Sequence, residues 1–219
     1  QRSWYNQQQE AMGADLNQER PLVWGDTLAD PIQLFFSGHI YPKGAQVAHQ
    51  LRRLLGDSLF WAGMQRFLTV NAYKPVRTEN FAVAFEQVAN RDLDWFFDQW
   101  VYGIGYPKVS VTRHWDAAAK QLQVTVPQTH KIDSTHPLFR FPVTLRMITA
   151  DSVVRRELMV TKPSETFNIS ISQEPLSFRF DEGAWLLGTV TTDQTPAELA
   201  AMARHDLEYG ARHWALLAL

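Results

Sequence analysis

The sequence contains no cysteine. This absence excludes disulfide bonds, thiolate zinc sites, iron–sulfur clusters and a cysteine nucleophile. Proteins without cysteine occur in reducing and in oxidising compartments, so the composition leaves a cytoplasmic location and a periplasmic or secreted one equally open.

A strong charge of one sign and a long hydrophobic run are also missing. The chain has 21 Lys and Arg residues against 23 Asp and Glu residues, which gives a formal net charge of −2. Such a balance creates no basic field that would hold nucleic acid or an anionic membrane surface. No run approaches the roughly 18 apolar residues of a membrane-spanning helix. We therefore expect no nucleic-acid partner and no membrane span.

What is present is the composition of an ordinary globular protein. Of the 219 residues, 45% are hydrophobic, and eight Trp and 13 Phe residues are among them. This is enough for a substantial core in roughly one or two domains. The chain starts at Gln1, with neither a basic segment nor an apolar leader after it. We therefore expect it to be a fragment of a longer protein.

Apolar residues at helical spacing predict a compact helical unit, which follows a polar helix over residues 1–14 and a loop over residues 21–31. Four predicted helices with short connections cover residues 41–56, 57–68, 78–88 and 92–103. Gly56 and Gly103 are expected to end the first and the last of these helices. The starts of the second, third and fourth helices are expected to be capped by Asp57, Thr78 and Asp92.

After residue 107 the hydrophobic period changes to two, which is typical of strands. In one such segment Leu122, Val124 and Val126 alternate with polar residues. Six or seven short strands of this kind, separated by turn-rich segments, predict a small antiparallel β-sandwich.

At Thr195 the helical signal returns. Thr195 as N-cap, Pro196 at the first helical position and Glu198 three residues after the cap form a capping box. We expect this helix to end at Gly210 and a second helix to begin within residues 211–219.

The metal-binding and nucleophile motifs of hydrolases are missing from this chain. There is no H-E-x-x-H helix, and the nearest imitation, His205 with His213, would place the two rings about 12 Å apart along a helix. The other histidines have no ligand-like spacing, so we assign no metal ligand here. A G-x-S-x-G nucleophile turn is absent as well. Two carboxylate pairs are interpreted as capping and turn residues: Asp92 with Asp94, and Asp181 with Glu182.

One segment, residues 38–45, suggests more than packing. Pro42 suits the first turn of a helix and disfavours helical backbone at the residue before it. We therefore expect Tyr41 in an extended conformation, with its phenol held rigidly at the start of the helix. Two roles are open at this point: a side chain packed at a loop-to-helix junction, or a hydrogen-bond donor positioned for catalysis.

Several motifs follow one another in a familiar order. Residues 41–57 read Y-P-K-G-A-Q-V-A-H-Q-L-R-R-L-L-G-D, and residues 78–81 read T-E-N-F. Residues 92–101 read D-L-D-W-F-F-D-Q-W-V, and residues 105–107 read G-Y-P. In order and spacing, this segment resembles the aminopeptidase N family of gluzincin zinc metallopeptidases. The resemblance is strongest over residues 41–107 and afterwards rests on architecture and scattered residues.

The resemblance implies an α+β fold with three parts. Residues 1–105 would be the helical C-terminal part of a thermolysin-like peptidase domain, residues 106–192 an antiparallel β-sandwich domain, and residues 193–219 the truncated start of an α-helical repeat domain. In that family the zinc ligands and the G-x-M-E-N segment for the amino group of the substrate lie upstream. This chain would therefore pack on a missing N-terminal part of its own protein. The intact parent would be a zinc metalloaminopeptidase that hydrolyses N-terminal residues from peptides, while this chain alone would hold no zinc and be inactive.

Tyr41 is the one catalytic residue that the resemblance carries over. It matches the family tyrosine that hydrogen-bonds the oxyanion of the tetrahedral intermediate opposite the zinc ion. Lys43 and Gly44 match as motif residues, without a chemical role for the lysine. For Gly44 the physical interpretation is a close approach of the backbone at the helix start. The substrate-binding residues remain unidentified.

Two other classes of function stay open. One is a non-catalytic scaffold, since the aminopeptidase fold also occurs in a transcription-factor subunit that has lost its zinc ligands. The other is a free-standing sandwich that serves as a binding module. An H-E-x-x-H motif upstream of Gln1 would favour the enzyme over the scaffold, and helices that are dispensable for folding would favour the module.

Overall fold

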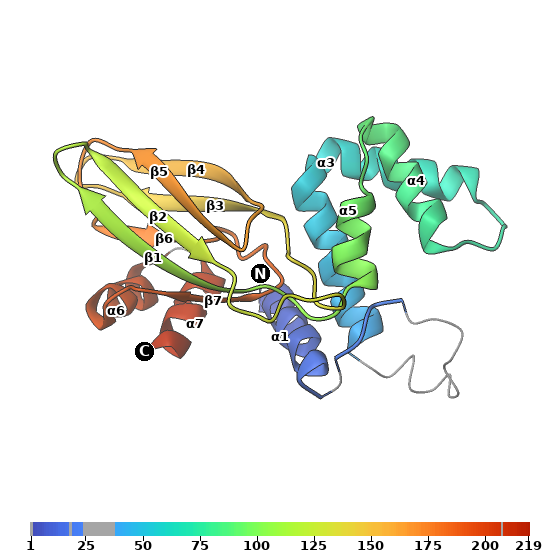
Figure 1. Ribbon diagram of the computed structural model, residues 1–219, viewed down its shortest axis with the longest axis horizontal. Coiled ribbons are helices and arrows are strands. Elements are labelled where there is room, and N and C mark those ends of the chain that lie inside the picture. Colours follow the sequence, from blue (N-terminus) through green and yellow to red (C-terminus); the bar gives the residue numbers. More distant parts are fainter. Residues whose placement is uncertain (1, 18, 24–37, 207) are drawn as a thin grey trace.

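The computed structural model describes residues 2–17, 19–23, 38–206 and 208–219. Helices gather at one end of the molecule and strands at the other, with the N-terminal helix between them and two C-terminal helices against the strands (Figure 1). This is the predicted α+β arrangement. None of the described helices combines the length and hydropathy that crossing a membrane requires. The loop predicted over residues 21–31 lies largely outside the described residues.

Within the described residues, six helical segments precede the first strand, and two of them, named η, have the wider π-helical turn. They are α1 (Arg2–Asn17), η1 (His39–Lys43), α3 (Gly44–Val70), α4 (Thr78–Ala89), α5 (Asp94–Phe97) and η2 (Asp98–Tyr102). Both predicted glycine positions are confirmed, since η2 is followed by Gly103 and α3 is kinked at Gly56, whose φ of 77° and ψ of 164° are not helical. Such a positive φ suits a residue without a Cβ atom.

Two helix starts differ slightly from the prediction. Thr78 is the first residue of α4 and not its cap, because the side-chain oxygen of Asn80 reaches back to accept the backbone N–H of Arg77 at 2.8 Å. The helix α5 starts at Asp94 with Leu93 as its cap, one residue after the predicted cap Asp92. The Asp92 carboxylate still accepts the N–H of Asp94 at 2.7 Å and so satisfies a free backbone donor.

In the part of the chain that the structure describes, seven strands form two sheets: β1 (Lys108–Asp116), β2 (Gln121–Pro127), β3 (Phe141–Ile148), β4 (Val153–Val160), β5 (Ser164–Ser170), β6 (Ser177–Arg179) and β7 (Thr189–Thr192). The four-stranded sheet has the order β5-β2-β1-β7, and the three-stranded sheet has the order β4-β3-β6. Alternate residues of β2 and β3 are buried, and the inward side chains of both sheets join one apolar core. The period-two pattern therefore identified the strands correctly.

The expectation of purely antiparallel strands is wrong at one edge. β7 pairs with β1 in parallel, with Lys108 opposite Thr189 and Val111 opposite Thr192. Residues 180–188 carry the chain from β6 in one sheet to the edge of the other. Because the chain changes sheets in this connection, β7 is not tied to an antiparallel neighbour by a tight hairpin.

The described residues after β7 form the helices α6 (Pro196–His205) and α7 (Tyr209–Ala218). The predicted capping box is confirmed, since Thr195 Oγ1 accepts the N–H of Glu198 at 3.3 Å and the N–H of Thr195 donates to Glu198 Oε2 at 2.8 Å. The predicted end at Gly210 is wrong, because Gly210 is the second residue of α7. The first helix stops earlier, at Asp206, which has extended backbone and accepts a hydrogen bond from Arg179 Nη1 at 3.3 Å.

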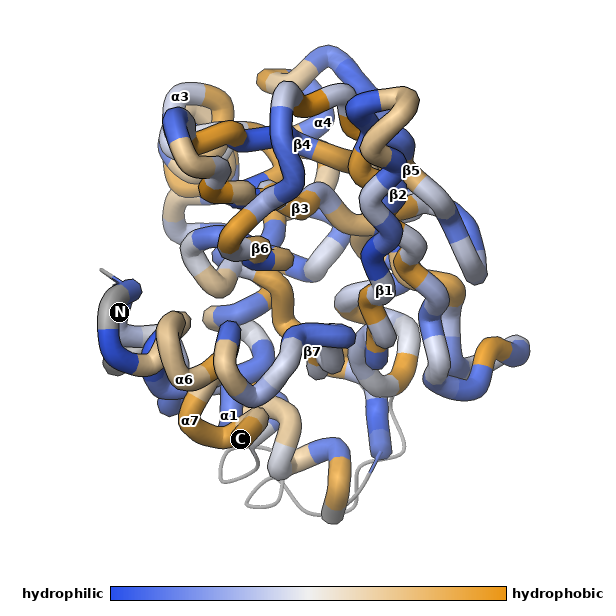
Figure 2. Tube along the Cα trace, turned by 90° about the vertical axis from the view of Figure 1, so that its left-hand side faces the viewer, coloured by the Kyte–Doolittle hydropathy of each residue, from blue (hydrophilic) through white to orange (hydrophobic). Residues whose placement is uncertain are grey.

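Hydrophobic residues end the described chain. The last turn of α7 is hydrophobic (orange beside the C-terminus in Figure 2), and Leu216, Leu217 and Leu219 are exposed there.

The helical end and the sheets share one core. Trp100 of η2 is buried against Phe139, with ring centroids 4.8 Å apart. Beside this contact, Gln99 Nε2 donates to the carbonyl of Arg140 at 2.6 Å, and the N–H of Arg140 donates back to Gln99 Oε1 at 2.8 Å. These paired bonds fix η2 against the segment that leads into β3.

Candidate functional site

Tyr41 lies in the middle of the π-helical turn η1. The N–H of Lys43 donates to the carbonyl of Gly38 at 3.1 Å, and the N–H of Gly44 donates to the carbonyl of His39. The phenol side chain projects from this turn and is 65% exposed. The extended conformation predicted for Tyr41 is therefore wrong: a residue before proline is biased away from helical backbone but not excluded from it, and Pro42 in a first turn needs no N–H partner.

The residues two positions before and after Tyr41 point the opposite way. His39 and Lys43 are only 2% and 1% exposed. Both contact the carboxylate of Asp15 in α1, which is itself 4% exposed: His39 Nε2 lies 2.8 Å from Asp15 Oδ1, and Lys43 Nζ lies 3.0 Å from Oδ2 and 3.3 Å from Oδ1. Two inward side chains four residues apart, with Tyr41 between them, follow from the periodicity of a helical turn.

The electrostatics of this group are those of a buried ion pair. Burial lowers the pKa of Lys43, and the negative charge of Asp15 opposes that shift. The ammonium group also donates to the carbonyl of Arg20 at 3.4 Å. Lys43, for which the sequence offered no role, therefore serves to hold η1 against α1.

A close backbone approach does occur here, but not at the glycine that the sequence suggested. A Cβ atom added at Gly44 would meet only Leu22 Cδ1, at an ordinary 3.8 Å. A Cβ atom at Gly38 would lie 2.8 Å from Ala14 Cβ and 3.0 Å from the carbonyl oxygen of Glu10. Gly38 thus allows η1 to approach α1 closely enough for the Asp15 contacts.

The sequence reasoning missed Asp15. It is 28 positions from Lys43, and no local pattern links a carboxylate near the end of a polar helix to a lysine so far along the chain. One signal was available: Asp15 falls on the same helix face as Ala11 and Met12, which are buried. An acidic residue on such a face needs a buried partner.

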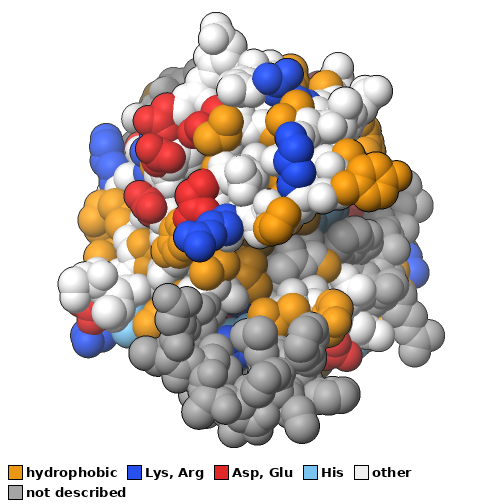
Figure 3. Space-filling view, turned by 90° about the vertical axis from the view of Figure 1, so that its right-hand side faces the viewer, with side chains coloured by type: hydrophobic (Ala, Val, Ile, Leu, Met, Phe, Trp, Pro, Cys, Tyr) orange, Lys and Arg blue, Asp and Glu red, His pale blue; other side chains and the backbone are white. Residues whose placement is uncertain are grey.

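Acidic side chains gather on the face of the molecule formed by its helical end (Figure 3). Among the described residues, Glu86, Asp92 and Asp94 bring ligand-type oxygens within 4.8 Å of one another. Glu86 Oε1 accepts the N–H of Leu93 at 2.9 Å, and the charge of Asp92 raises the pKa of Asp94. Three largely exposed carboxylates without an imidazole do not suit zinc, which prefers nitrogen and sulfur ligands. These contacts fit the start of α5 and not a zinc site.

The histidines that most resembled a metal motif are placed elsewhere. His213 packs edge-on against Tyr5, with centroids 4.5 Å apart, and stacks on Tyr209 at 5.8 Å. The side chain of His205 lies outside the described part of the chain.

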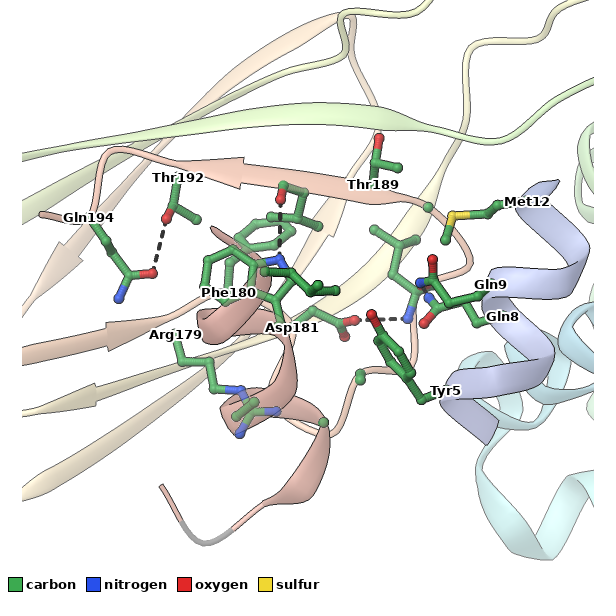
Figure 4. A pocket seen from close by; sticks show the side chains of 18 residues that line it. Tyr5, Gln8, Gln9, Met12, Arg179, Phe180, Asp181, Thr189, Thr192 and Gln194 are labelled. Atoms are coloured by element: carbon green, nitrogen blue, oxygen red, sulfur yellow. Dashed lines mark hydrogen bonds between the residues drawn. The ribbon is translucent and has the colours of Figure 1, made fainter. Parts of the chain in front are cut away.

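A cavity of about 230 Å³ lies between α1, the connection from β6 to β7, and α7. Tyr5, Gln8 and Met12 of α1 line one side, and Arg179 and Asp181 lie across from them (Figure 4).

Asp181 is the buried carboxyl group of this cavity. Its Oδ2 accepts the N–H of Leu186 at 2.9 Å, and burial raises the pKa of Asp181 to about 6. Its predicted turn role agrees with a backbone φ of 58° and with the bond from the N–H of Ala184 to its carbonyl. Glu182, the second member of the pair, accepts two hydrogen bonds from Arg155.

Comparison with known proteins relates this fold and site to one family. Residues 1–100 match the family model described as the peptidase family M1 domain. Aminopeptidase N of Haemophilus influenzae is 33% identical over 95 residues, which are 43% of this chain and 11% of that protein. The mitochondrial aminopeptidase 2 of Saccharomyces cerevisiae is 23% identical over 197 residues, covering 89% of this chain and 20% of that protein.

The fold likeness extends beyond the helical part. The crystal structure of Legionella pneumophila aminopeptidase A in complex with aspartic acid superposes with a TM-score of 0.72 at 17% identity, covering 84% of this chain and 21% of that one. Residues 1–100 are therefore similar to the M1 family of peptidases, whose matching relatives are aminopeptidases. The chain spans only about a tenth to a fifth of the length of the curated relatives that it matches.

Proposed function

We propose that this chain is part of a zinc-dependent aminopeptidase that hydrolyses N-terminal residues from peptides. The observation that carries the proposal is the family match over residues 1–100, which includes the turn that presents Tyr41. The described residues form no group that suits zinc, so the metal ligands are proposed to come from another part of the protein, as is the group that binds the amino end of the substrate.

The three-part division remains part of this proposal. Residues 1–105 would close a thermolysin-like peptidase domain, residues 106–192 would form a sandwich domain, and residues 193–219 would begin a helical domain. Support comes from the change from helices to strands between Tyr102 and Lys108 and from the capped start of α6 at Pro196.

The proposed role of Tyr41 is to donate a hydrogen bond to the oxygen of the scissile carbonyl. As the tetrahedral intermediate forms, this oxygen gains negative charge, so a fixed O–H donor stabilises the transition state more than the ground state. Two observations support the role. The phenol is exposed, and the buried side of the turn that carries it is fixed by the contact of Lys43 with Asp15. An exposed donor on a fixed backbone is what such a contact needs.

The test is Tyr41→Phe in the protein in which this chain follows an intact H-E-x-x-H segment. The substitution keeps the ring and deletes the hydroxyl. By analogy with other oxyanion donors, kcat should fall on the order of 10²–10³-fold, about 2.7–4 kcal/mol, with zinc content and melting temperature nearly unchanged.

Tyr102→Phe is the matched control. Tyr102 is also exposed on a π-helical segment, but its hydroxyl donates to Glu79 at 3.1 Å. Its loss should leave kcat as it is. If Tyr41→Phe keeps kcat within about threefold of the unmodified enzyme, roughly 0.65 kcal/mol, or lowers only the melting temperature, Tyr41 is a packing residue.

A further inference from the structure

The turn that carries Tyr41 is held by charges that are almost completely removed from solvent. The Asp15 carboxylate receives the Lys43 ammonium on both oxygens and the His39 imidazole on one. These contacts anchor the turn through the side chains of His39 and Lys43, two residues before and two residues after Tyr41. Pro42, whose ring fixes φ, stiffens the segment between them.

Stability alone is a poor explanation for this group. A buried ion pair recovers little of the cost of desolvating its charges, and apolar residues of similar volume often give equal or greater stability. What charge-assisted hydrogen bonds supply in addition is direction, because each donor must meet a carboxylate oxygen at a defined distance and angle. The side chains around Tyr41 therefore define where the turn sits on α1.

Orientation matters at this position because of the chemistry proposed for the phenol. A displacement of about 1 Å at a catalytic contact can lower the rate on the order of 10²-fold. We propose that Asp15 and Lys43 are positioning residues, which hold the π-helical turn so that the Tyr41 hydroxyl meets the carbonyl oxygen of the substrate. This inference rests on the proposed function of Tyr41.

The first test is kinetic and uses the whole enzyme. Asp15→Asn keeps the shape of the side chain and removes its charge, and kcat should fall between about 10-fold and 10²-fold with KM changed less than about threefold. In the double variant with Tyr41→Phe, the Asp15→Asn change should lower kcat by no more than about a further twofold. The Tyr41 hydroxyl is already absent in that variant, so its position can no longer affect the rate.

Asp15→Asn leaves Lys43 buried without its counter-ion, which threatens folding. The double variant Asp15→Asn with Lys43→Met removes both charges and keeps the length of the lysine stem. It should fold and still show the loss of kcat. Asp57→Asn is the matched control, since Asp57 pairs with Arg52 at 2.7 Å on the surface of α3, and it should leave kcat unchanged.

The second test does not depend on activity and uses the 219-residue chain itself. Hydrogen–deuterium exchange should accelerate at least about fivefold in residues 38–46 of both Asp15 variants, since the amides of Lys43 and Gly44 donate the bonds of the turn. The amides of α4 (Thr78–Ala89) serve as the internal reference and should be unchanged. If Asp15 and Lys43 only stabilised the fold, exchange would accelerate in residues 38–46 and in α4 together.

The outcomes separate the inference from the proposed function. If Tyr41→Phe lowers kcat while the Asp15 variants keep it within threefold, or if the two losses multiply, the positioning role is overturned and the role of Tyr41 stands. Unchanged exchange in residues 38–46, or unfolding of both Asp15 variants, overturns the positioning role as well. If Tyr41→Phe leaves kcat unchanged, the proposed function fails and the positioning role fails with it.

Discussion

The buried carboxyl group of Asp181 should make the stability of this protein depend on pH in an unusual direction. Asp181 follows β6, is 8% exposed and accepts backbone N–H groups from Leu186 and Trp185. These bonds and the charges of Arg179 and Arg53 favour the ionised form, yet desolvation outweighs them and raises the pKa from 3.8 to about 6.

The sign follows from comparing the folded and unfolded chains. In the unfolded chain Asp181 loses its proton near pH 4, whereas in the folded chain it keeps the proton up to about pH 6. Between these values the unfolded state binds fewer protons, so the free energy of unfolding falls as the pH rises. A difference of about two pKa units corresponds to about 3 kcal/mol, all of which is lost above pH 6.

Asp181→Asn removes the titration and keeps a side-chain oxygen for the N–H of Leu186. Relative to the unmodified chain, the variant should gain about 3 kcal/mol between pH 4 and pH 7. Urea unfolding at pH 4, 5, 6, 7 and 8, followed by tryptophan fluorescence, measures the difference. His49 contributes a trend of the opposite sign: burial lowers its pKa to about 4, so the free energy of unfolding decreases as the pH falls below about 6.5. Comparing the two chains at each pH cancels this contribution.

Glu174→Gln, which removes an exposed carboxyl group between β5 and β6 and leaves the buried one in place, is the control. If the Asp181→Asn curve runs parallel to that of the unmodified chain from pH 4 to pH 8, the carboxyl group is ionised in the folded protein and the reasoning from its burial is refuted.

Two further predictions concern the metal and the packing of the helices. The 219-residue chain alone should retain no stoichiometric zinc after dialysis and cleave no aminoacyl-anilide, whereas one tightly bound zinc per chain would contradict the assignment of the ligands to another part of the protein. Gly63→Ala should lower the free energy of unfolding by about 1–3 kcal/mol, because its Cβ would lie 2.5 Å from the buried ring of Phe85. Gly13→Ala, where a Cβ meets nothing within 4 Å, should instead raise it by up to about 1 kcal/mol, and equal effects of the two in urea unfolding would refute the contact.

The parts of the fold that depend on local pattern could be predicted from the sequence. Leu122, Val124 and Val126 alternate and are buried as expected, and the capping box at Thr195 forms as its spacing indicates. Such features depend on neighbours within a few residues, so the chain specifies them locally.

The features that could not be predicted depend on residues far apart in the chain. The parallel pairing of β7 arises from a crossing between sheets, and the stop of α6 at Asp206 depends on Arg179 of β6. The contact of Asp15 with Lys43 joins two helices whose relative position no periodicity encodes. Tyr41 could be singled out by its motif, but its outward direction became clear only from the burial of its neighbours.

The connection between β6 and β7 contacts the helices that precede the sheets. Trp185 in this connection stacks on His49 of α3, with centroids 4.2 Å apart and planes 10° apart, and its carbonyl accepts a hydrogen bond from the side chain of Gln50.

The next carbonyl, that of Leu186, accepts a hydrogen bond from Gln8 of α1. The two-sheet unit thus contacts both helices that frame the turn of Tyr41, and its Phe139 is fully buried against Trp100. A sheet unit without the helices would expose that ring and leave these carbonyl groups without their partners, at a cost of roughly 1–3 kcal/mol for each buried group that solvent cannot reach. This argues against a free-standing binding module and for strands that help to support the helices carrying Asp15 and Tyr41.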